Sequence, residues 1–200
     1  ADVAKAVGVR PGSVRPTDDG VQTRVRTDAG WLGFQEYFVR EKCAPEVHEI
    51  VFDGIEAARP TPEALAAIDS AELIVIAPSN PLVSIAPILG IPGLRRAVAE
   101  ATAPRVAVSP LIAGKVVKGP ADRMLVSLGH RQDAVGVARL YDDLLDILII
   151  DTADAALSTE IEALGIGVAT TDILMRDAAD KARLAAEVLA LARQPEGAPA

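Results

Sequence analysis

The chain has 200 residues, half of them apolar, and a net charge of −8. This apolar content excludes a disordered chain, and the negative charge argues against broad affinity for nucleic acid or for an anionic membrane. No apolar run approaches the roughly 18 residues that a membrane-spanning helix needs, and residues 1–9 lack the apolar centre of a secretory signal. The single cysteine, Cys43, cannot form an internal disulfide, which favours a reducing compartment. Together these features predict a cytoplasmic protein.

The region before residue 60 is predicted to be rich in strands. Apolar and polar residues alternate over residues 21–26, which is the pattern of a half-exposed strand. Asp28-Ala29-Gly30 then turns the chain into a second strand over Leu32–Val39, so that the two strands form an antiparallel hairpin. A further strand is expected over Val47–Phe52.

From residue 60 the pattern changes to an alternation of helices and strands. The first helix is expected to start at Thr61 as its N-cap, with Pro62 at the first helical position. The unbroken apolar run Leu73–Ala77 predicts a strand that is buried on both faces. The helices are expected near residues 61–70, 94–101, 120–128, 133–140, 154–163 and 177–192, and the strands near 73–77, 105–108, 145–150 and 166–169.

This alternation implies parallel strands joined by right-handed crossovers. We therefore predict a single α/β domain over residues 1–200, built on an open, mainly parallel, Rossmann-like sheet with a β-hairpin insertion near the N-terminus. The strands Leu73–Ala77, Arg105–Val108 and Leu145–Ile150 are expected to be adjacent or nearly adjacent in that sheet.

In an open parallel sheet, ligands bind beyond the carboxyl ends of the strands, and two loops at such positions are unusual. The first loop follows Leu73–Ala77 and displays Ser79 and Asn80 between two prolines. Ser84 falls near the start of the next helical turn, where free N–H groups and the helix dipole favour an anion. These residues fit a phosphate or nucleotide clamp, and they fit equally well the plain capping of a helix.

The second loop follows Arg105–Val108 and runs from Ser109 to Pro120. Lys115 and Lys118 lie beside glycines in this loop, where ammonium and N–H groups could surround a diphosphate. The loop lies in a stretch, residues 95–131, where basic residues outnumber acids, although such a stretch is also compatible with ordinary solvated helix faces. The pattern differs from a Walker P-loop, because Ser109 and Val116 stand where that motif needs Gly and Ser or Thr.

Other motifs are weaker. Asp18 and Asp19 could orient a substrate hydroxyl or bind a metal, or could form only an Asx-turn. His48 and His130 have no metal-ligand spacing to each other or to Cys43, which argues against a zinc site.

Four motifs, in order along the chain, resemble a known family. The motifs are Pro16-Thr17-Asp18-Asp19, Phe34-Gln35-Glu36-Tyr37-Phe38-Val39-Arg40, the loop Ala77–Leu89, and Val108–Lys115 with Lys118-Gly119-Pro120. Together they resemble the phospholactate or phosphoenolpyruvate transferases of coenzyme F-420 biosynthesis, which join a phosphate-linked three-carbon acid to the deazariboflavin Fo. The resemblance spans the whole chain.

The resemblance implies a transferase whose donor is a guanosine diphosphate-activated phospholactate, phosphoenolpyruvate or phosphoglycerate. A ribityl hydroxyl of Fo attacks the activated phosphate, GMP leaves and Mg²⁺ assists. It also implies that Ser79, Asn80, Ser84, Ser109, Lys115 and Lys118 bind the nucleotide part of the donor, and that Asp18 and Asp19 orient a substrate.

The chain also departs from the family pattern. The family begins with a strand, a glycine-rich turn and metal-binding aspartates, which correspond to nothing here. We therefore expect no metal ligands in this chain, no activity of the chain by itself, and either marginal stability or self-association as a homo-oligomer. Gly20 and Arg24 stand where the family usually has Arg and His.

Two other functions were compared with this one. A non-catalytic sister branch of the same superfamily binds nucleotide sugars, but it tends to carry a Gly-Pro-Gly-Ser loop where this chain has Ser79-Asn80-Pro81. A fragment of a dinucleotide-dependent dehydrogenase would need a glycine fingerprint, and Gly165-Ile166-Gly167 lacks the third glycine of that motif.

Overall fold

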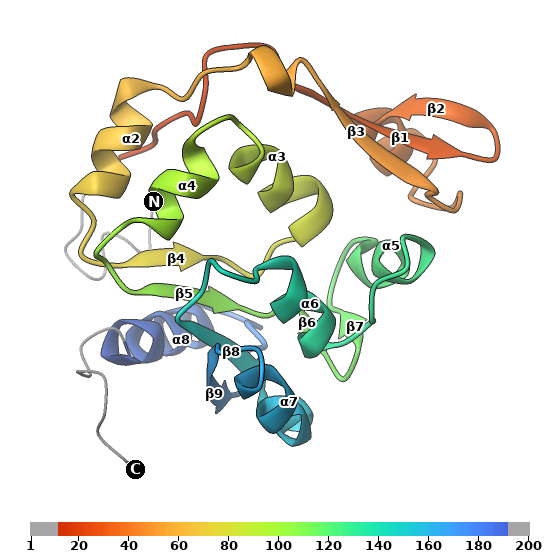
Figure 1. Ribbon diagram of the computed structural model, residues 1–200. Helices are drawn as coiled ribbons and strands as arrows, with labels where there is room; N and C mark the ends of the chain where they lie inside the picture. Colours follow the sequence, from red (N-terminus) through yellow and green to blue (C-terminus); the bar gives the residue numbers. More distant parts are fainter. Residues whose placement is uncertain (1–11, 192–200) are drawn as a thin grey trace.

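The computed structural model describes residues 12–191, which form a mixed α/β fold around a four-stranded parallel sheet (Figure 1). The strand order in this sheet is β4-β5-β8-β9, and two antiparallel sheets have the orders β2-β1-β3 and β6-β7. The fold class predicted from the sequence is confirmed. The strands are β1 (Gln22–Thr27), β2 (Gly30–Gly33), β3 (Glu49–Asp53), β4 (Ile74–Ile76), β5 (Arg105–Val108), β6 (Leu111–Ile112), β7 (Lys115–Val116), β8 (Ile147–Asp151) and β9 (Gly167–Thr171).

The helical elements alternate with the strands after residue 60, as the sequence predicts. The α-helices are α2 (Pro62–Asp69), α3 (Ala86–Leu89), α4 (Leu94–Ala99), α5 (Ala121–Ser127), α6 (Ala134–Leu140), α7 (Ser158–Glu162) and α8 (Ala178–Leu191). The described residues also form four short helices of other types: the π-helices η1 (Glu36–Arg40) and η3 (Pro81–Ile85), and the 3₁₀-helices η2 (Ile55–Ala57) and η4 (Thr152–Leu157).

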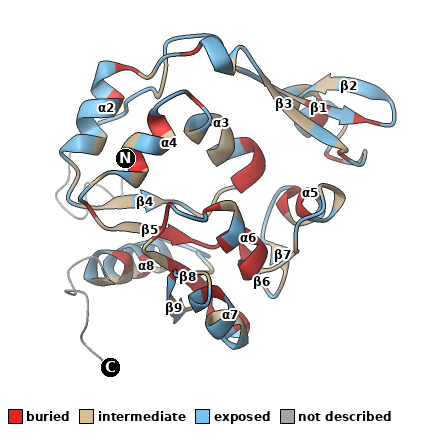
Figure 2. Ribbon diagram, viewed as in Figure 1, coloured by how far each residue is buried: buried red, intermediate tan, exposed pale blue. Residues whose placement is uncertain are grey.

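The two central strands, β5 and β8, contribute residues to the core on both faces of the sheet. Along β5, Val106 and Val108 pack with residues of α8, whereas Ala107 between them belongs to the larger core on the opposite face. Such alternation follows from the pleat, which sends successive side chains to opposite faces of a sheet. Figure 2 shows the buried residues gathered on β5, β8 and α6. The sheet is therefore a rigid base for the loops at its carboxyl ends.

Within residues 12–191 β4 is an edge strand, so the prediction that Leu73–Ala77 is buried on both faces is wrong for the part of the chain that the structure describes. Within the described residues β4 pairs only with β5, and Val75 is 44% exposed. The apolar run correctly marks a strand, but the position of a strand in a sheet depends on which strands pair with it. The expected neighbourhood is confirmed, since β4, β5 and β8 are consecutive and parallel.

The strands before residue 60 form a separate antiparallel sheet, here called the arm (residues 22–53). The expected hairpin is present, because β1 pairs with β2, and β3 adds to the other edge of β1. The expectation of a strand over Leu32–Val39 is wrong beyond Gly33, since residues 36–40 are helical. An exposed ion pair between Arg40 and Glu36, four residues apart, stabilises this turn, and Tyr37 in the same turn is buried in the core.

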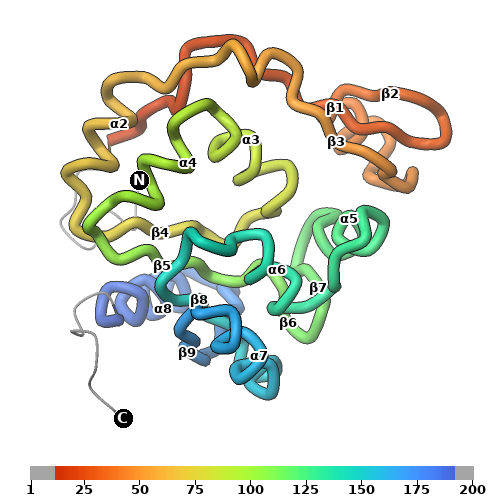
Figure 3. The backbone as a smooth tube through the Cα atoms, viewed as in Figure 1, coloured from red at the N-terminus to blue at the C-terminus, as the bar shows by residue number. Residues whose placement is uncertain are grey.

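The start of α2 follows the capping residue in the sequence. The hydroxyl of Thr61 accepts a hydrogen bond from the N–H of Ala64, so the N-cap predicted for α2 is confirmed. Thr61 also joins α2 to the first described segment, because its hydroxyl donates to the carbonyl of Arg15. This segment therefore runs alongside the chain that enters α2, as Figure 3 shows. None of the helices in residues 12–191 has the length and apolar character to cross a membrane.

Candidate functional site

A cavity of about 490 Å³ lies at the carboxyl ends of the parallel strands. This volume is within the range of small-molecule sites, which is about 300–1,000 Å³. Four segments line the cavity: the arm, the loop after β4, the loop after β5 and the loop after β9. Its lining residues are Phe34, Gln35, Phe38, Pro78, Ser79, Asn80, Val83, Ser84, Ser109, Pro110, Ile112, Val116, Val117, Lys118, Gly119, Pro120, Ala121, Ile173, Leu174 and Met175.

The topology explains why these segments meet. Parallel strands all end at the same edge of the sheet, and in Figure 1 the arrows of β4 and β5 point toward the side that carries the arm and α5. Three of the four segments are loops that follow strands of this sheet, and the fourth segment, the arm, covers these loops. The cavity therefore has the position at which open α/β sheets bind their ligands.

The first loop brings Ser79, Asn80 and Ser84 to the cavity. Asn80 is the N-cap of η3, where its side-chain oxygen accepts from the N–H of Leu82. Its amide nitrogen lies 3.5 Å from the sulfur of Met124 in α5. Asn80 thus fixes the loop to α5, and Ser84 is the exposed hydroxyl in the following turn.

The second loop turns back on itself as the β6–β7 hairpin. Ser109 is fully buried, and its hydroxyl accepts from the N–H of Leu111 and donates to the Leu111 carbonyl. The two residues at the tip, Ala113 and Gly114, both have positive φ (47° and 73°), as a type I′ turn requires. Ser109 therefore shapes this part of the cavity, because both hydrogen bonds of its hydroxyl stay within the loop and its N–H donates to the carbonyl of Ile149 in β8.

The two lysines of this loop lie in different places. Lys118 lines the cavity, whereas Lys115 lines a second cavity of about 420 Å³ together with Arg123 of α5. In the hairpin, Lys115 and Val116 are neighbours in one strand, so the pleat directs their side chains to opposite sides. The structure thus brings together five of the six predicted nucleotide-binding residues, and Lys115 is the exception.

Asp18 and Asp19 lie outside the cavity lining. The carboxylate of Asp18 pairs with Arg15, and that of Asp19 accepts from the N–H of Arg59. The N–H of Asp19 donates to the hydroxyl of Thr17, which makes a local turn. Asp19 thus joins the first described segment to the chain before α2, whereas the ion pair of Asp18 lies within that segment.

The arm and the segment after β9 contribute apolar lining residues that were not predicted as site residues: Phe34, Phe38, Ile173, Leu174 and Met175. The rings of Phe34 and Phe38 are tilted by 36°, with centroids 5.8 Å apart. Sequence reasoning could have found the segment after β9, since it too follows the carboxyl end of a parallel strand.

The cavity is polar at one part of its lining and apolar at another. Lys118 is the single charged side chain among the lining residues, and the lining contains no carboxylate. No group among the described residues accepts a hydrogen bond from the N–H groups of Lys118 and Gly119. Cationic and N–H groups beside an apolar wall suit a ligand that combines an anionic group with a planar ring.

The family model described as "2-phospho-L-lactate transferase CofD" matches residues 1–188. The chain belongs to the CofD family. Among its relatives, the phosphoenolpyruvate transferase of Streptomyces griseus is 41% identical over 89% of this chain, and that of Kitasatospora aureofaciens is 43% identical over 89%. The 2-phospho-L-lactate transferase of Methanopyrus kandleri is 36% identical over 98% of the chain.

The chain spans 58%, 57% and 62% of the length of these three relatives, respectively. A crystal structure of a member of the UPF0052 family from Bacillus halodurans has a similar fold, with a TM-score of 0.63 and 15% sequence identity. The match covers 94% of this chain and 65% of that structure. The resemblance inferred from the four sequence motifs is thus confirmed for the family and for the fold.

Proposed function

We propose that this chain forms the donor-binding part of a transferase in coenzyme F-420 biosynthesis. The transferase moves a phospho-three-carbon-acid group from a guanosine diphosphate-activated donor to the deazariboflavin Fo. The observation that carries the proposal is the cavity itself, in which the two loops of the family motifs meet beyond the carboxyl ends of β4 and β5. The names of the relatives, phosphoenolpyruvate transferase and 2-phospho-L-lactate transferase, support this reaction class.

In this proposal the ribityl hydroxyl of Fo attacks the phosphorus that carries the three-carbon acid. A new oxygen–phosphorus bond forms, the bond from that phosphorus to the oxygen of GMP breaks, and the hydroxyl proton passes to solvent. Negative charge grows on the phosphate of the departing GMP. Lys118 and the N–H groups beside it are suited to stabilise that charge, and such fixed donors contribute mainly by electrostatics and positioning.

Mg²⁺ enters the proposal through the family resemblance. Mg²⁺ usually binds protein through one or two carboxylates together with substrate phosphates. The cavity lining includes no carboxylate, and the described residues contain no group of three or more His, Cys, Asp or Glu residues that could hold a metal ion. The residues that the structure describes do not fit a Mg²⁺ site, so no step of the reaction is derived through the ion.

A transfer assay tests the proposal. The protein, at the length of its relatives, is incubated with Fo and each of the three guanosine diphosphate-activated acids, and products are followed by mass spectrometry. We expect equal amounts of GMP and of Fo bearing the phospho-acid for at least one donor. Binding of nucleotide sugars with no transfer from any donor would contradict the proposal and would favour a regulatory relative.

A further inference from the structure

Two buried carboxylates lie behind the cavity without lining it. Asp151 ends strand β8 and is 7% exposed, and Asp154 lies in η4 and is 6% exposed. Buried carboxylates are uncommon unless they are paired or hydrogen-bonded. Neither of these has an ion pair among the described residues, and both accept hydrogen bonds from backbone N–H groups instead.

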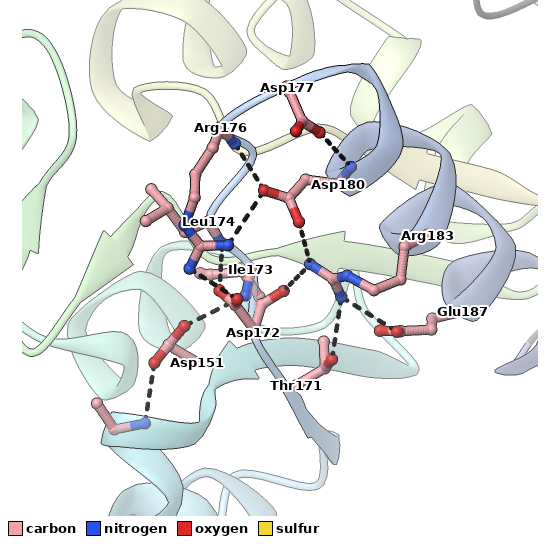
Figure 4. Close-up of polar contacts among 11 residues, drawn as sticks. Asp151, Thr171, Asp172, Ile173, Leu174, Arg176, Asp177, Asp180, Arg183 and Glu187 are labelled. Carbon is pink, nitrogen blue, oxygen red and sulfur yellow. Dashed lines mark hydrogen bonds and ion pairs between the residues drawn. The ribbon is translucent and has the colours of Figure 1, made fainter.

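Asp151 joins the end of β8 to the loop that follows β9. One of its carboxylate oxygens accepts from the N–H of Ala153 at 2.9 Å, and the other accepts from the N–H of Ile173 at 3.2 Å. Ile173 begins the apolar segment of the cavity lining. Figure 4 shows Asp151 reaching this segment from below.

The same loop is held from its other side by two arginines (Figure 4). Arg176 bonds the carboxylates of Asp172 and Asp180, at 2.9 and 3.1 Å. Arg183 donates to the carbonyl of Asp172 at 2.6 Å. These arginine contacts are partly exposed, and such contacts contribute little individually. The buried bonds of Asp151 are therefore the stronger constraint on where Ile173 lies.

Asp154 holds the loop that follows β5, as Asp151 holds the loop that follows β9. Its carboxylate accepts from the N–H of Ala113 at 2.9 Å. Ala113 has a φ of 47°, a left-handed conformation that residues other than glycine, asparagine and aspartate rarely adopt. The bond fixes the tip of the β6–β7 hairpin, whose next residues, Val116 to Lys118, line the cavity.

We propose that Asp151 and Asp154 are positioning residues, which set the shape of the ligand cavity by holding its apolar wall and its lysine-bearing loop. The proposal rests on the proposed function, since GDP is the ligand whose affinity reports the shape of the cavity. Both residues act through backbone N–H groups and touch no part of the cavity themselves.

The two residues differ in a way that allows a sharp test. Asp151 uses both of its oxygens, so asparagine, which has one acceptor oxygen, must lose one of its bonds. Asp154 uses one oxygen, so Asp154→Asn keeps its bond to Ala113. Burial raises the pKa of Asp154, so a neutral side chain is well suited to this position.

The experiment measures GDP affinity by calorimetry and amide hydrogen exchange by mass spectrometry on the same variants. We expect Asp151→Asn, Asp151→Ala and Asp154→Ala to weaken GDP binding about fivefold to twentyfold, and Asp154→Asn to bind within about twofold of the unchanged protein. Exchange should accelerate in residues 171–176 for the Asp151 variants and in residues 111–116 for Asp154→Ala. Thr61→Ala removes the buried cap of α2 and serves as the control, which should lower the melting temperature without changing GDP affinity.

Equal GDP affinity in the two Asp154 variants, or unchanged exchange in both loops of folded alanine variants, would overturn the proposal. Asp151→Asn preserves the shape of the side chain, so unchanged GDP affinity and unchanged exchange in this variant would overturn the proposal even if the alanine variants fail to fold. Absence of GDP binding by the unchanged protein would reject the proposed function alone, because the exchange pattern still shows whether each carboxylate holds its loop.

Discussion

Asp146 binds both the backbone and the side chain of Arg105 at the start of two neighbouring strands. One carboxylate oxygen accepts from the Arg105 N–H at 2.7 Å and from its Nε at 3.0 Å, and the other accepts from an Nη at 2.5 Å. Arg105 also donates to the carbonyl of Ala99 in α4. The pair therefore joins the amino ends of β5 and β8 to the end of α4, on the side of the sheet opposite the cavity.

We expect Asp146→Ala to lower the free energy of unfolding by about 1–2 kcal/mol, because it leaves the half-buried guanidinium with one partner fewer. Urea unfolding of the variant checks this value. Asp53→Ala, which removes an exposed partner of Arg24, is the control and should change stability by about 0.5 kcal/mol or less. A loss no larger than that of the control would contradict the account of the pair.

The same pair predicts how stability depends on pH. Burial alone would raise the pKa of Asp146, but the hydrogen bonds and charge of Arg105 outweigh this effect and lower the pKa below its usual value. The carboxylate thus stabilises the folded state fully above pH of about 4, and this contribution is lost as the pH falls toward the lowered pKa. Unfolding measured between pH 2 and 6 should show a smaller acid destabilisation for Asp146→Asn than for the unchanged protein. Identical pH profiles would contradict this assignment.

Gly114→Ala should destabilise the protein through the β6–β7 hairpin. A Cβ at this position would lie 2.7 Å from the carbonyl oxygen of Gln132, and the φ of 73° is unfavourable for alanine. Together these effects should cost about 2–3 kcal/mol. Gly129, with a φ of 79° and open space around it, is a matched control for which the alanine variant should cost only about 1 kcal/mol. Equal losses of stability in Gly114→Ala and Gly129→Ala would show that the close approach to Gln132 does not contribute to the cost.

The Cys43 thiol should react slowly with thiol reagents while the protein is folded. The residue is 6% exposed, and burial raises the pKa of its thiol although the charge of Arg123 partly opposes this effect. We expect the rate at pH 7 to be at least about a hundredfold below that of the unfolded chain, as the thiolate is both rarer and covered. A colorimetric thiol assay with and without denaturant measures the ratio. Rapid modification of the folded protein would mean that the loop after η1 opens readily.

The parts of this fold that depend on local pattern can be predicted from the sequence. β5 has the predicted bounds, because the apolar run is enclosed by Pro104 on one side and Ser109-Pro110 on the other. α2 starts at its predicted cap, since the hydroxyl of Thr61 and the ring of Pro62 both act within one turn. The location of the cavity also follows, because it depends only on parallel strands ending at one edge.

Features that depend on pairing between distant segments could not be predicted. β4 has the composition of a central strand, and its place at the edge of the sheet among residues 12–191 follows only from the strand pairing. The β6–β7 hairpin turns at Ala113-Gly114 rather than at Asn-Gly or Asp-Gly, so its turn has no strong sequence signal. Without the hairpin, the sequence could not separate Lys115 from Lys118. The hydrogen bond of Asp154 could not be predicted either, because its partner, Ala113, lies 41 residues away in the sequence.

We propose that the cavity binds the nucleotide part of the donor and that Lys118 faces it. Lys118 and Lys115 are both exposed lysines of the same loop, but only Lys118 lines the cavity. This makes Lys115→Ala a control that is matched in chemistry and position along the chain. A charge-assisted bond to phosphate is worth about 1.5–3 kcal/mol, which corresponds to a tenfold to hundredfold change in Kd.

The most direct test is therefore the calorimetric Kd for GDP of three proteins: unchanged, Lys118→Ala and Lys115→Ala. We predict that Lys118→Ala weakens GDP binding about tenfold to a hundredfold and that Lys115→Ala leaves it within about twofold. Equal affinities for all three proteins, or a loss confined to Lys115→Ala, would contradict the account.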